Sequence, residues 1–481
     1  MAGIVSYGAY IPYYRLERKK MAEAFGERAM VGERAVANFD EDSVSMSVNA
    51  ALDCLQEFAG REVDGVFFAT TTAAYEEKQA AGTVAAALDL KSNVRVADVT
   101  GSLRASSAAM LSALDMVRAG AKGALAVTAD CRLGAPQGQN EQLFGDGAAA
   151  FLFGSGDDVI AKAVAVHSHS REQIGGWRNK GDKFVHSWEE RFVQTVYGET
   201  VGASVRGVLE TAGMQPGDFS RIVMAGPAPK AQMAIAGMLG FQKEQFQDPL
   251  TDSVGMTGTA HAPMMLVAAL EQARPGDKIL FVSFGEGSDA IVFEVTAAIE
   301  RLPRRLGISG HLASKSNLIR YADYLKWRGV LPAEPPRRPE TPRPSVTAMQ
   351  RNYHQNLALY GSKCLECGTP QFPKQRVCVQ CQAKDRMEDY RFYGKTARIA
   401  TYTIDYLAAS PAPPTVVAVV DFEGGGRIMC EVTDCDPAEV RIGMELEMTF
   451  RRLYQAGGIH NYFWKAKPYR RVAEHEQRNH R

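Results

Sequence analysis

Four clustered cysteines constrain the fold of this chain more than any other feature of its sequence. Residues 364–381 read CLECGTPQFPKQRVCVQC, so that ten residues separate two Cys-x-x-Cys pairs. Each pair can place two thiolates on one tight turn, and two such turns close a tetrahedral sulfur site suited to zinc. We predict that Cys364, Cys367, Cys378 and Cys381 bind a structural zinc ion. The alternative is four free thiols or a redox pair.

The overall composition limits the compartment and the partners of the chain. The 481 residues contain 55 Lys and Arg against 55 Asp and Glu, so the net charge gives no reason to expect binding to nucleic acid or to a membrane surface. The first residues lack the pattern of a signal peptide, and no apolar run approaches the roughly 18 residues of a membrane span. We therefore expect a cytoplasmic protein in which clustered cysteines bind metal rather than form disulfides.

The pattern of apolar residues predicts an α/β region followed by smaller domains. Up to about residue 300, short apolar strands alternate with helices rich in Ala and Gly, which indicates buried sheets with helices on their faces. FGDGAAAFLFG at 144–154 is echoed by FGEGSDAIVFEV at 284–295, which suggests a duplicated α/β unit. A Pro-rich, charged stretch then precedes the cysteines, and five short strands of alternating polarity after them predict a small β-barrel.

These patterns divide the chain into six expected segments. They are an N-terminal α/β half (1–160), a C-terminal α/β half with a helical extension (161–330), a Pro-rich linker (331–346), a helix and four-cysteine ribbon (347–390), a β-barrel (391–471) and a polar tail (472–481).

Two parts of the sequence resemble known families. The first ~330 residues are similar to thiolase-fold enzymes of the archaeal 3-hydroxy-3-methylglutaryl-CoA (HMG-CoA) synthase type, through DVTGSLRASS, GPAPKAQMAIAGMLGF, SVGMTGTAHAP, SFGEGSDA and YADYLKWRG. The last ~120 residues resemble the rubredoxin-like zinc ribbon plus OB-fold module known as DUF35, through the cysteine cluster and GGIHNYFWKAKPYR. The resemblance implies a duplicated five-layer α-β-α-β-α fold followed by the ribbon and an OB-fold barrel.

The same resemblance implies a catalytic set for Claisen-type condensation that this chain lacks. The family's Glu base, Cys nucleophile, His and Asn fall by local motif on Thr71, Leu103, Ala225 and Met256. Leu and Ala cannot transfer a proton or hold an acyl group, and Met offers only a weakly accepting sulfur. We therefore expect that the covalent mechanism cannot run in this domain.

Two further residues are candidates for the remaining functions. Lys230 matches a lysine that faces the CoA phosphates in the family, and it either binds a phosphate here or is a solvated surface lysine. His261 lies five residues after the lost Asn position, and it is either a relocated acid or base or a hydrogen-bonded packing residue. Basic and aromatic residues alternate near the end of the barrel, which suits the adenine and phosphates of CoA better than nucleic acid in a chain without net charge.

Three classes of function are compatible with these features. The first, which we favour, is a non-catalytic synthase-like subunit that binds zinc and acyl-CoA and supports a separate, cysteine-bearing thiolase in making or breaking C–C bonds. The second is a free-standing acyl-CoA acyltransferase or lyase that uses residues such as His261. The third is a scaffold without a catalytic role. The family's assembly implies a homodimeric core inside a hetero-oligomer.

Overall fold

The computed structural model describes most of the 481-residue chain. It describes all residues except 57–61, 228, 318, 333, 335–341 and 471–481, and it does not describe the side chains of Pro229, Lys230 and Met233. Much of the expected linker (331–346) and the whole expected tail (472–481) therefore lie outside the described residues.

A nine-stranded mixed sheet organises the first 300 residues. Its order is β11-β12-β13-β8-β1-β7-β6-β4-β5. The N-terminal strands are β1 (Ala2–Tyr10), β4 (Gly65–Ala69), β5 (Arg95–Val99), β6 (Ala124–Asp130) and β7 (Gly147–Ser155). The C-terminal strands are β8 (Ala161–Ser170), β11 (Arg221–Met224), β12 (Lys278–Gly285) and β13 (Gly287–Val295).

The strand order reveals an internal duplication. β1 and β8 meet at the centre through a short pairing of Gly3 with Lys162 and Ile4 with Ala161. On either side, β7 and β13 occupy equivalent places, followed by β6 and β12 and then by β4 and β11. The two echoed sequence segments run into β7 and β13, so the echo reflects equivalent positions in the two halves.

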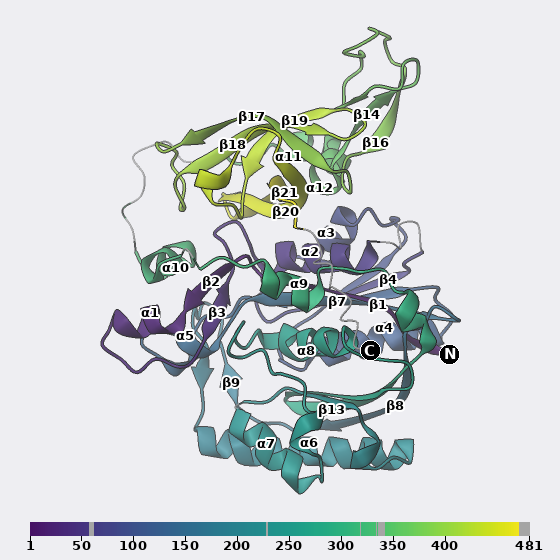
Figure 1. Ribbon diagram of the computed structural model, residues 1–481, viewed down its shortest axis with the longest axis vertical. Helices are drawn as coiled ribbons and strands as arrows, with labels where there is room; N and C mark the ends of the chain where they lie inside the picture. The colour runs from purple at the N-terminus through teal and green to yellow at the C-terminus, as the bar shows by residue number, and fades with distance from the viewer. Residues whose placement is uncertain (57–61, 228, 318, 333, 335–341, 471–481) are drawn as a thin grey trace, which may run out of the picture.

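Helices complete the five layers (Figure 1). On the outer face of the N-terminal strands lie α2 (Ser43–Leu55) and α3 (Ala81–Ala87), and on that of the C-terminal strands lie α6 (Glu190–Ala212) and α7 (Pro229–Met238). Between the two sets of strands lie α4 (Ala105–Arg118) and α8 (His261–Leu270). All ten residues of α8 are buried, as expected for a helix that is apolar on every side and lies at the centre of a domain. The fold predicted by the resemblance is confirmed.

Smaller elements connect and cover these layers. They are β2 (Tyr14–Glu17), α1 (Arg18–Glu23), β3 (Glu33–Val36), α5 (Gln139–Leu143), β9 (Gly176–Trp177), β10 (His186–Ser187), α9 (Gly307–Ala313) and α10 (Tyr321–Trp327). β9 and β10 pair as a short antiparallel hairpin.

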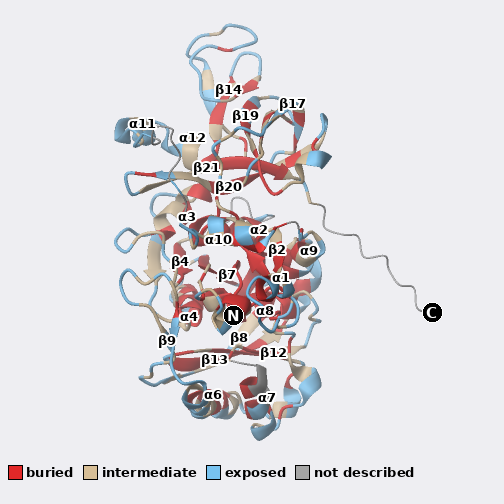
Figure 2. Cartoon of the chain, turned by 90° about the vertical axis from the view of Figure 1, so that its left-hand side faces the viewer, coloured by how far each residue is buried: buried red, intermediate tan, exposed pale blue. Residues whose placement is uncertain are grey.

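The C-terminal part consists of a ribbon and a closed barrel. After α11 (Val346–Arg351) and α12 (Tyr353–Ala358), the ribbon contains β14 (Tyr360–Cys364), β15 (Pro370–Gln371) and β16 (Met387–Arg391). The barrel strands are β17 (Ala397–Asp405), β18 (Thr415–Phe422), β19 (Arg427–Val432), β20 (Glu445–Ala456) and β21 (Ile459–Pro468), in the order β17-β18-β19-β21-β20. The barrel lies over α2 and α3, and its strands carry a buried face toward its interior (Figure 2). No helix among the described residues is long and apolar enough to cross a membrane.

Candidate functional site

A cavity of about 1080 Å³ opens between the two halves of the α/β region. Its walls include the segments that follow β4, β5, β6, β11 and β12, so the carboxyl ends of parallel strands from both halves meet there. The ends of parallel strands are the usual place for a binding site in a sheet of this kind. All four degenerate positions, Thr71, Leu103, Ala225 and Met256, line this cavity together with His261.

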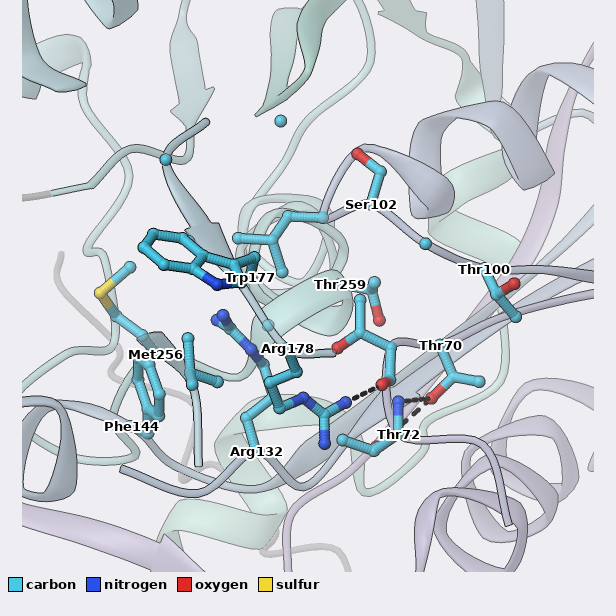
Figure 3. A pocket seen from close by; sticks show the side chains of 18 of the residues that line it. Thr70, Thr72, Thr100, Ser102, Arg132, Phe144, Trp177, Arg178, Met256 and Thr259 are labelled. Atoms are coloured by element: carbon cyan, nitrogen blue, oxygen red, sulfur yellow. Dashed lines mark hydrogen bonds between the residues drawn. The ribbon is translucent and has the colours of Figure 1, made fainter. Parts of the chain in front are cut away.

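A buried carboxylate lies beneath the threonines of the cavity lining, of which Thr70, Thr72 and Thr259 are labelled in Figure 3. Asp130, at the end of β6, accepts hydrogen bonds from the hydroxyls of Thr70 (2.9 Å), Thr71 (2.9 Å) and Thr72 (3.0 Å). It also accepts from the backbone N–H groups of Thr71 (2.7 Å) and Thr259 (2.8 Å). The Thr71 hydroxyl is therefore a donor to Asp130, so a positioned threonine occupies the place at which the resemblance implies a glutamate base.

The predicted strand–turn–helix around Leu103 is present between β5 and α4. Leu103 is half-buried and lines the cavity without filling it. The flanking Arg104 forms an ion pair of 2.7 Å with Asp289, which belongs to the other half of the fold. The Ser102 hydroxyl donates a hydrogen bond to the Glu286 carboxylate. Contacts between the two halves thus hold the turn in place, although the Leu103 side chain offers no nucleophile.

His261 is the first residue of α8 and is 4% exposed. Burial lowers the pKa of its imidazole to about 4, because the apolar surroundings disfavour the charged form. The ring is therefore neutral near pH 7. The ring lines the cavity, so a relocated acid or base and a packing residue both stay open as roles of His261.

Two arginines in the cavity were missed by the sequence analysis. Arg132 follows β6, and its guanidinium lies 4.6 Å from the ring centroid of Phe144. Arg178 follows β9, and its Nη2 donates a hydrogen bond to the carbonyl oxygen of Thr71. Trp177, next to Arg178, lines the same cavity (Figure 3). The signal in the sequence was a basic residue two positions after a buried strand, in ADCRLG.

The other predicted CoA contact could not be placed. Lys230 belongs to α7 by its backbone, and its side chain lies outside the described part of the structure.

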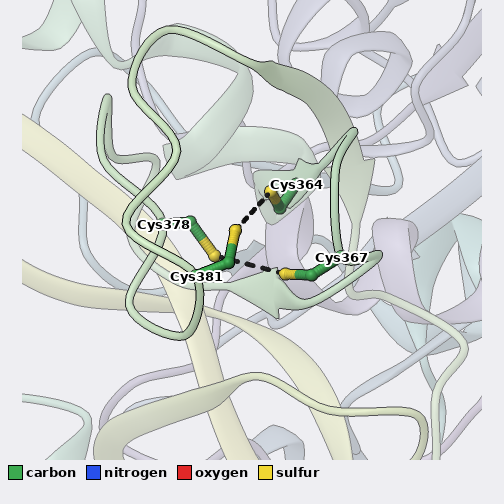
Figure 4. A group of neighbouring side chains, drawn as sticks. All are labelled: Cys364, Cys367, Cys378 and Cys381. Carbon is green, nitrogen blue, oxygen red and sulfur yellow. Dashed lines mark hydrogen bonds between the residues drawn. The ribbon is translucent and has the colours of Figure 1, made fainter.

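The four clustered cysteines converge at the turns of the ribbon (Figure 4). Their sulfur atoms all lie within 4.8 Å of one another. The sulfurs of Cys364 and Cys381 are 3.6 Å apart, and those of Cys367 and Cys378 are 3.5 Å apart. A tetrahedral zinc with bonds of about 2.3 Å places its sulfur ligands about 3.8 Å apart. The arrangement therefore fits a structural zinc site with four thiolate ligands and no open position.

Family models match three segments of the chain. Residues 390–451 match the C-terminal OB-fold domain of ChsH2, and residues 356–388 match the rubredoxin-like zinc ribbon domain of ChsH2. Residues 209–294 match the C-terminal region of 3-oxoacyl-[acyl-carrier-protein] synthase III.

Relatives of similar sequence cover the α/β region. A hydroxymethylglutaryl-CoA synthase of Caldivirga maquilingensis is 30% identical over 343 residues, which cover 68% of this chain and 98% of the relative. The synthase of Archaeoglobus fulgidus is 32% identical over 347 residues, which cover 69% of this chain and 100% of the relative.

Solved structures share the fold. An HMG-CoA synthase complexed with CoA has a TM-score of 0.62 at 18% identity, covering 68% of this chain and 89% of that chain. The 3-oxoacyl-(acyl carrier protein) synthase III of Pseudomonas aeruginosa has a TM-score of 0.56 at 24% identity, covering 61% of this chain and 98% of that chain.

Proposed function

The α/β region places the chain in the hydroxymethylglutaryl-CoA synthase family, and a zinc ribbon and an OB-fold barrel are fused to that region. We propose that the chain acts as a non-catalytic synthase-like subunit. In this role it binds an acyl-CoA thioester in the central cavity and supports a separate thiolase, which carries an intact catalytic cysteine. That thiolase makes or breaks the C–C bond.

The observation that carries this proposal is a cavity that is present although the four catalytic groups implied by the resemblance are missing from its lining. Thr71, Leu103, Ala225 and Met256 meet around one cavity of about 1080 Å³, at the positions where the resemblance implies Glu, Cys, His and Asn. No cysteine lines the cavity among the residues that the structure describes. Covalent acyl transfer needs a nucleophile and a base within hydrogen-bonding reach of each other, and this lining offers no thiol for that purpose.

Contacts between the barrel and the cavity wall support a joint role for the two parts. Tyr75 lines the cavity, and its hydroxyl accepts a hydrogen bond of 2.8 Å from the backbone N–H of His460 in β21. The rings of Tyr75 and His460 are also in contact, with centroids 4.8 Å apart. The barrel therefore makes a direct contact with a residue of the cavity lining. In the DUF35 family, which the zinc ribbon and the barrel resemble, such modules act beside thiolases, and this supports the proposed partner.

The half-exposed edge of the sheet supports the proposed assembly. β5 forms one end of the nine-stranded sheet, and none of its five residues is buried. An edge strand presents unpaired backbone groups that a second copy can cover. We propose a homodimeric core that associates with the thiolase in a hetero-oligomer.

Affinity purification of the tagged chain from its native host tests the proposal. We expect a thiolase with an intact catalytic cysteine to co-purify, and we expect the native mass of the complex to contain two copies of this chain. Isothermal titration of the purified chain should detect CoA binding. If no thiolase co-purifies and no CoA binding is detected, the result would favour a scaffold instead.

His261 favours one competing function, because its imidazole lines the cavity, where a neutral ring can donate or accept a hydrogen bond to a ligand. Turnover of acyl-CoA by the purified chain alone, abolished in His261→Gln, would overturn our proposal in favour of a free-standing enzyme. As a control, we expect that Leu103→Cys alone does not restore condensation of acetyl-CoA, since Thr71, Ala225 and Met256 still lack the other functional groups.

A further inference from the structure

The end of the cavity at which the resemblance implies the acyl chemistry is largely apolar. Three of the four positions there carry Leu103, Ala225 and Met256. The fourth carries Thr71, whose hydroxyl is already engaged because it donates a hydrogen bond of 2.9 Å to Asp130. An acyl group that enters this end therefore meets apolar side chains at three positions and a threonine with its hydrogen bond already made at the fourth.

Two aromatic residues flank these positions. Phe144 lies beside Met256, because the two residues form a β-bridge. Trp177 directly precedes Arg178, whose Nη2 donates a hydrogen bond to the carbonyl oxygen of Thr71. Phe144, Trp177 and Met256 all line the cavity and are drawn around it in Figure 3. Both aromatic residues therefore belong to the end of the cavity that would receive the acyl group.

Neighbouring groups hold the ring of Trp177 in place. It stacks on the ring of His186, with centroids 5.5 Å apart and planes 22° apart, and its centroid lies 5.9 Å from that of Trp188. The hairpin that carries these rings is tied to the other half of the fold, because the backbone N–H of Val185 donates a hydrogen bond of 3.0 Å to the carbonyl oxygen of Leu133. A ring that is fixed before the ligand arrives loses little conformational freedom on binding.

Charged groups of the lining face partners within the protein. Burial lowers the pKa of Arg132 to about 10, and the carboxylates of Asp130 and Glu286 oppose this effect because they favour its charge. An ion pair of 2.8 Å joins Lys180 to Glu76. These two cations already face carboxylates of the chain, so they give no reason to expect a charged acyl group.

The cavity also has room for a bulky acyl group. Its volume is about 1080 Å³, whereas pockets of roughly 300–1,000 Å³ hold whole drug-sized ligands. A ring at the acyl end and the thioester arm that leads to it can therefore occupy the cavity together.

We propose that the cavity takes acyl-CoA thioesters whose acyl group carries an aromatic ring, and that this ring packs against Trp177. The inference rests on the proposed function for acyl-CoA binding and adds the class of acyl group. Contact between two aromatic rings adds attraction beyond the burial of apolar surface, and the thioether of Met256 also suits contact with the edge of an aromatic ring.

Three thioesters test this inference. Isothermal titration compares acetyl-CoA, benzoyl-CoA and cyclohexanecarbonyl-CoA, of which the last two carry six-membered carbon rings that differ in aromaticity. We expect the wild-type chain to bind benzoyl-CoA at least about tenfold more tightly than acetyl-CoA, because the ring buries more apolar surface. We expect it to bind benzoyl-CoA about threefold more tightly than cyclohexanecarbonyl-CoA, because the contact between aromatic rings is lost in the latter.

Variants of Trp177 test the assigned residue. Trp177→Ala should weaken the binding of benzoyl-CoA about tenfold and change that of acetyl-CoA less than about twofold, and Trp177→Phe should keep part of the preference for benzoyl-CoA. Tyr406→Ala removes an exposed aromatic side chain of the barrel outside the cavity and should keep the wild-type affinities. Thermal unfolding of each variant checks that it is folded.

The outcomes separate the inference from the proposed function. Equal affinity for acetyl-CoA and benzoyl-CoA overturns the inference and leaves the proposed function standing. Equal affinity for benzoyl-CoA and cyclohexanecarbonyl-CoA overturns the aromatic class of the acyl group. Equal weakening of CoA and all three thioesters in Trp177→Ala overturns the assignment to Trp177, since its ring would then contact CoA itself. No binding of CoA or of any thioester overturns the proposed function as well.

Discussion

At the scale of single residues, His261 shows how burial alone changes the chemistry of a side chain. Desolvation is the one cause that lowers its pKa, to about 4 from the ordinary value of 6.5. The folded chain therefore binds fewer protons than the unfolded chain between about pH 4 and pH 6.5. Stability must rise with pH across this window and fall on acidification.

We expect this titration to be measurable in the free energy of unfolding. Between pH 7 and pH 5, His261 should cost the α/β region about 2 kcal/mol, because the unfolded imidazole takes up a proton that the buried one does not. Urea unfolding at both pH values measures the loss, and His261→Gln should show a loss smaller by that amount.

The comparison with the variant is needed because other buried groups titrate too. Glu41 has a pKa raised to about 7, mainly by burial, so its contribution to stability falls as the pH rises from about 4.5 to 7. His311, with a pKa of about 3, acts in the same direction as His261. An equal loss in wild type and His261→Gln would contradict the assignment to His261.

The sequence could place some residues of the cavity and not others. Thr71, Leu103, Ala225 and Met256 were found because each lies in a local motif, and the structure brings them around one cavity. Arg132 and Arg178 could not be found in this way. Their proximity depends on how the segment after β9 packs against the floor of the other half, a long-range contact without a local pattern.

At the scale of elements, the ribbon was the most predictable part of the chain. Two Cys-x-x-Cys turns fix where four sulfurs meet, because the spacing within each turn is set by local backbone geometry. The strands of the barrel were also predictable, since their apolar residues alternate, as in the fully alternating pattern of β18. The order of strands in the nine-stranded sheet was not, because pairing between β1 and β8 joins residues that are far apart in sequence.

The ribbon should depend on its metal. β14, β15 and β16 form a small sheet next to the cysteines, and Cys364 and Cys378 are buried. Four thiolates held this closely repel one another without a cation, and a structural zinc site contributes its binding free energy to folding. We expect one zinc per chain, and we expect chelation to abolish hydrogen-exchange protection in Tyr360–Cys364 and Met387–Arg391 while the α/β region keeps its protection.

Variants distinguish metal binding from the packing of cysteine side chains. Cys378→Ser should lose both the zinc and the protection of the ribbon, whereas Cys435→Ser, a free cysteine after β19, should keep both. Protection of the ribbon that survives complete removal of zinc would contradict a structural role for the metal.

At the scale of the whole molecule, the barrel and the α/β region share a buried ionic cluster. Arg451 in β20 is fully buried and forms ion pairs with Asp40 (3.3 Å) and Glu41 (2.5 Å) of the α/β region. It also pairs with Asp434 of the barrel. A Pro-rich stretch suggested separable domains in the sequence, but the charges that join them lie about 400 residues apart along the chain and have no signature in either segment.

Removing Arg451 should destabilise the contact between the two parts. In Arg451→Met, Asp40, Glu41 and Asp434 lose the buried cation that faces all three, and of these carboxylates Asp40 keeps an ion pair of 2.9 Å with Lys465. Breaking a buried ion pair by removal of one partner typically costs about 3–5 kcal/mol, because the uncompensated charges stay buried. We expect a loss of this size in the free energy of unfolding, and faster proteolysis between the α/β region and the barrel.

Arg427→Met is the matched control for this experiment. Arg427 pairs with Asp421 on an exposed hairpin of the same barrel, where solvent screens the charges, so we expect no resolvable change in the free energy of unfolding. If Arg451→Met is as stable as Arg427→Met, the cluster does not hold the barrel against the α/β region. In that case other buried contacts would hold the barrel over the α/β region, such as the hydrogen bonds that the Asn38 side chain donates to Thr433 (3.2 Å) and Asp434 (3.3 Å).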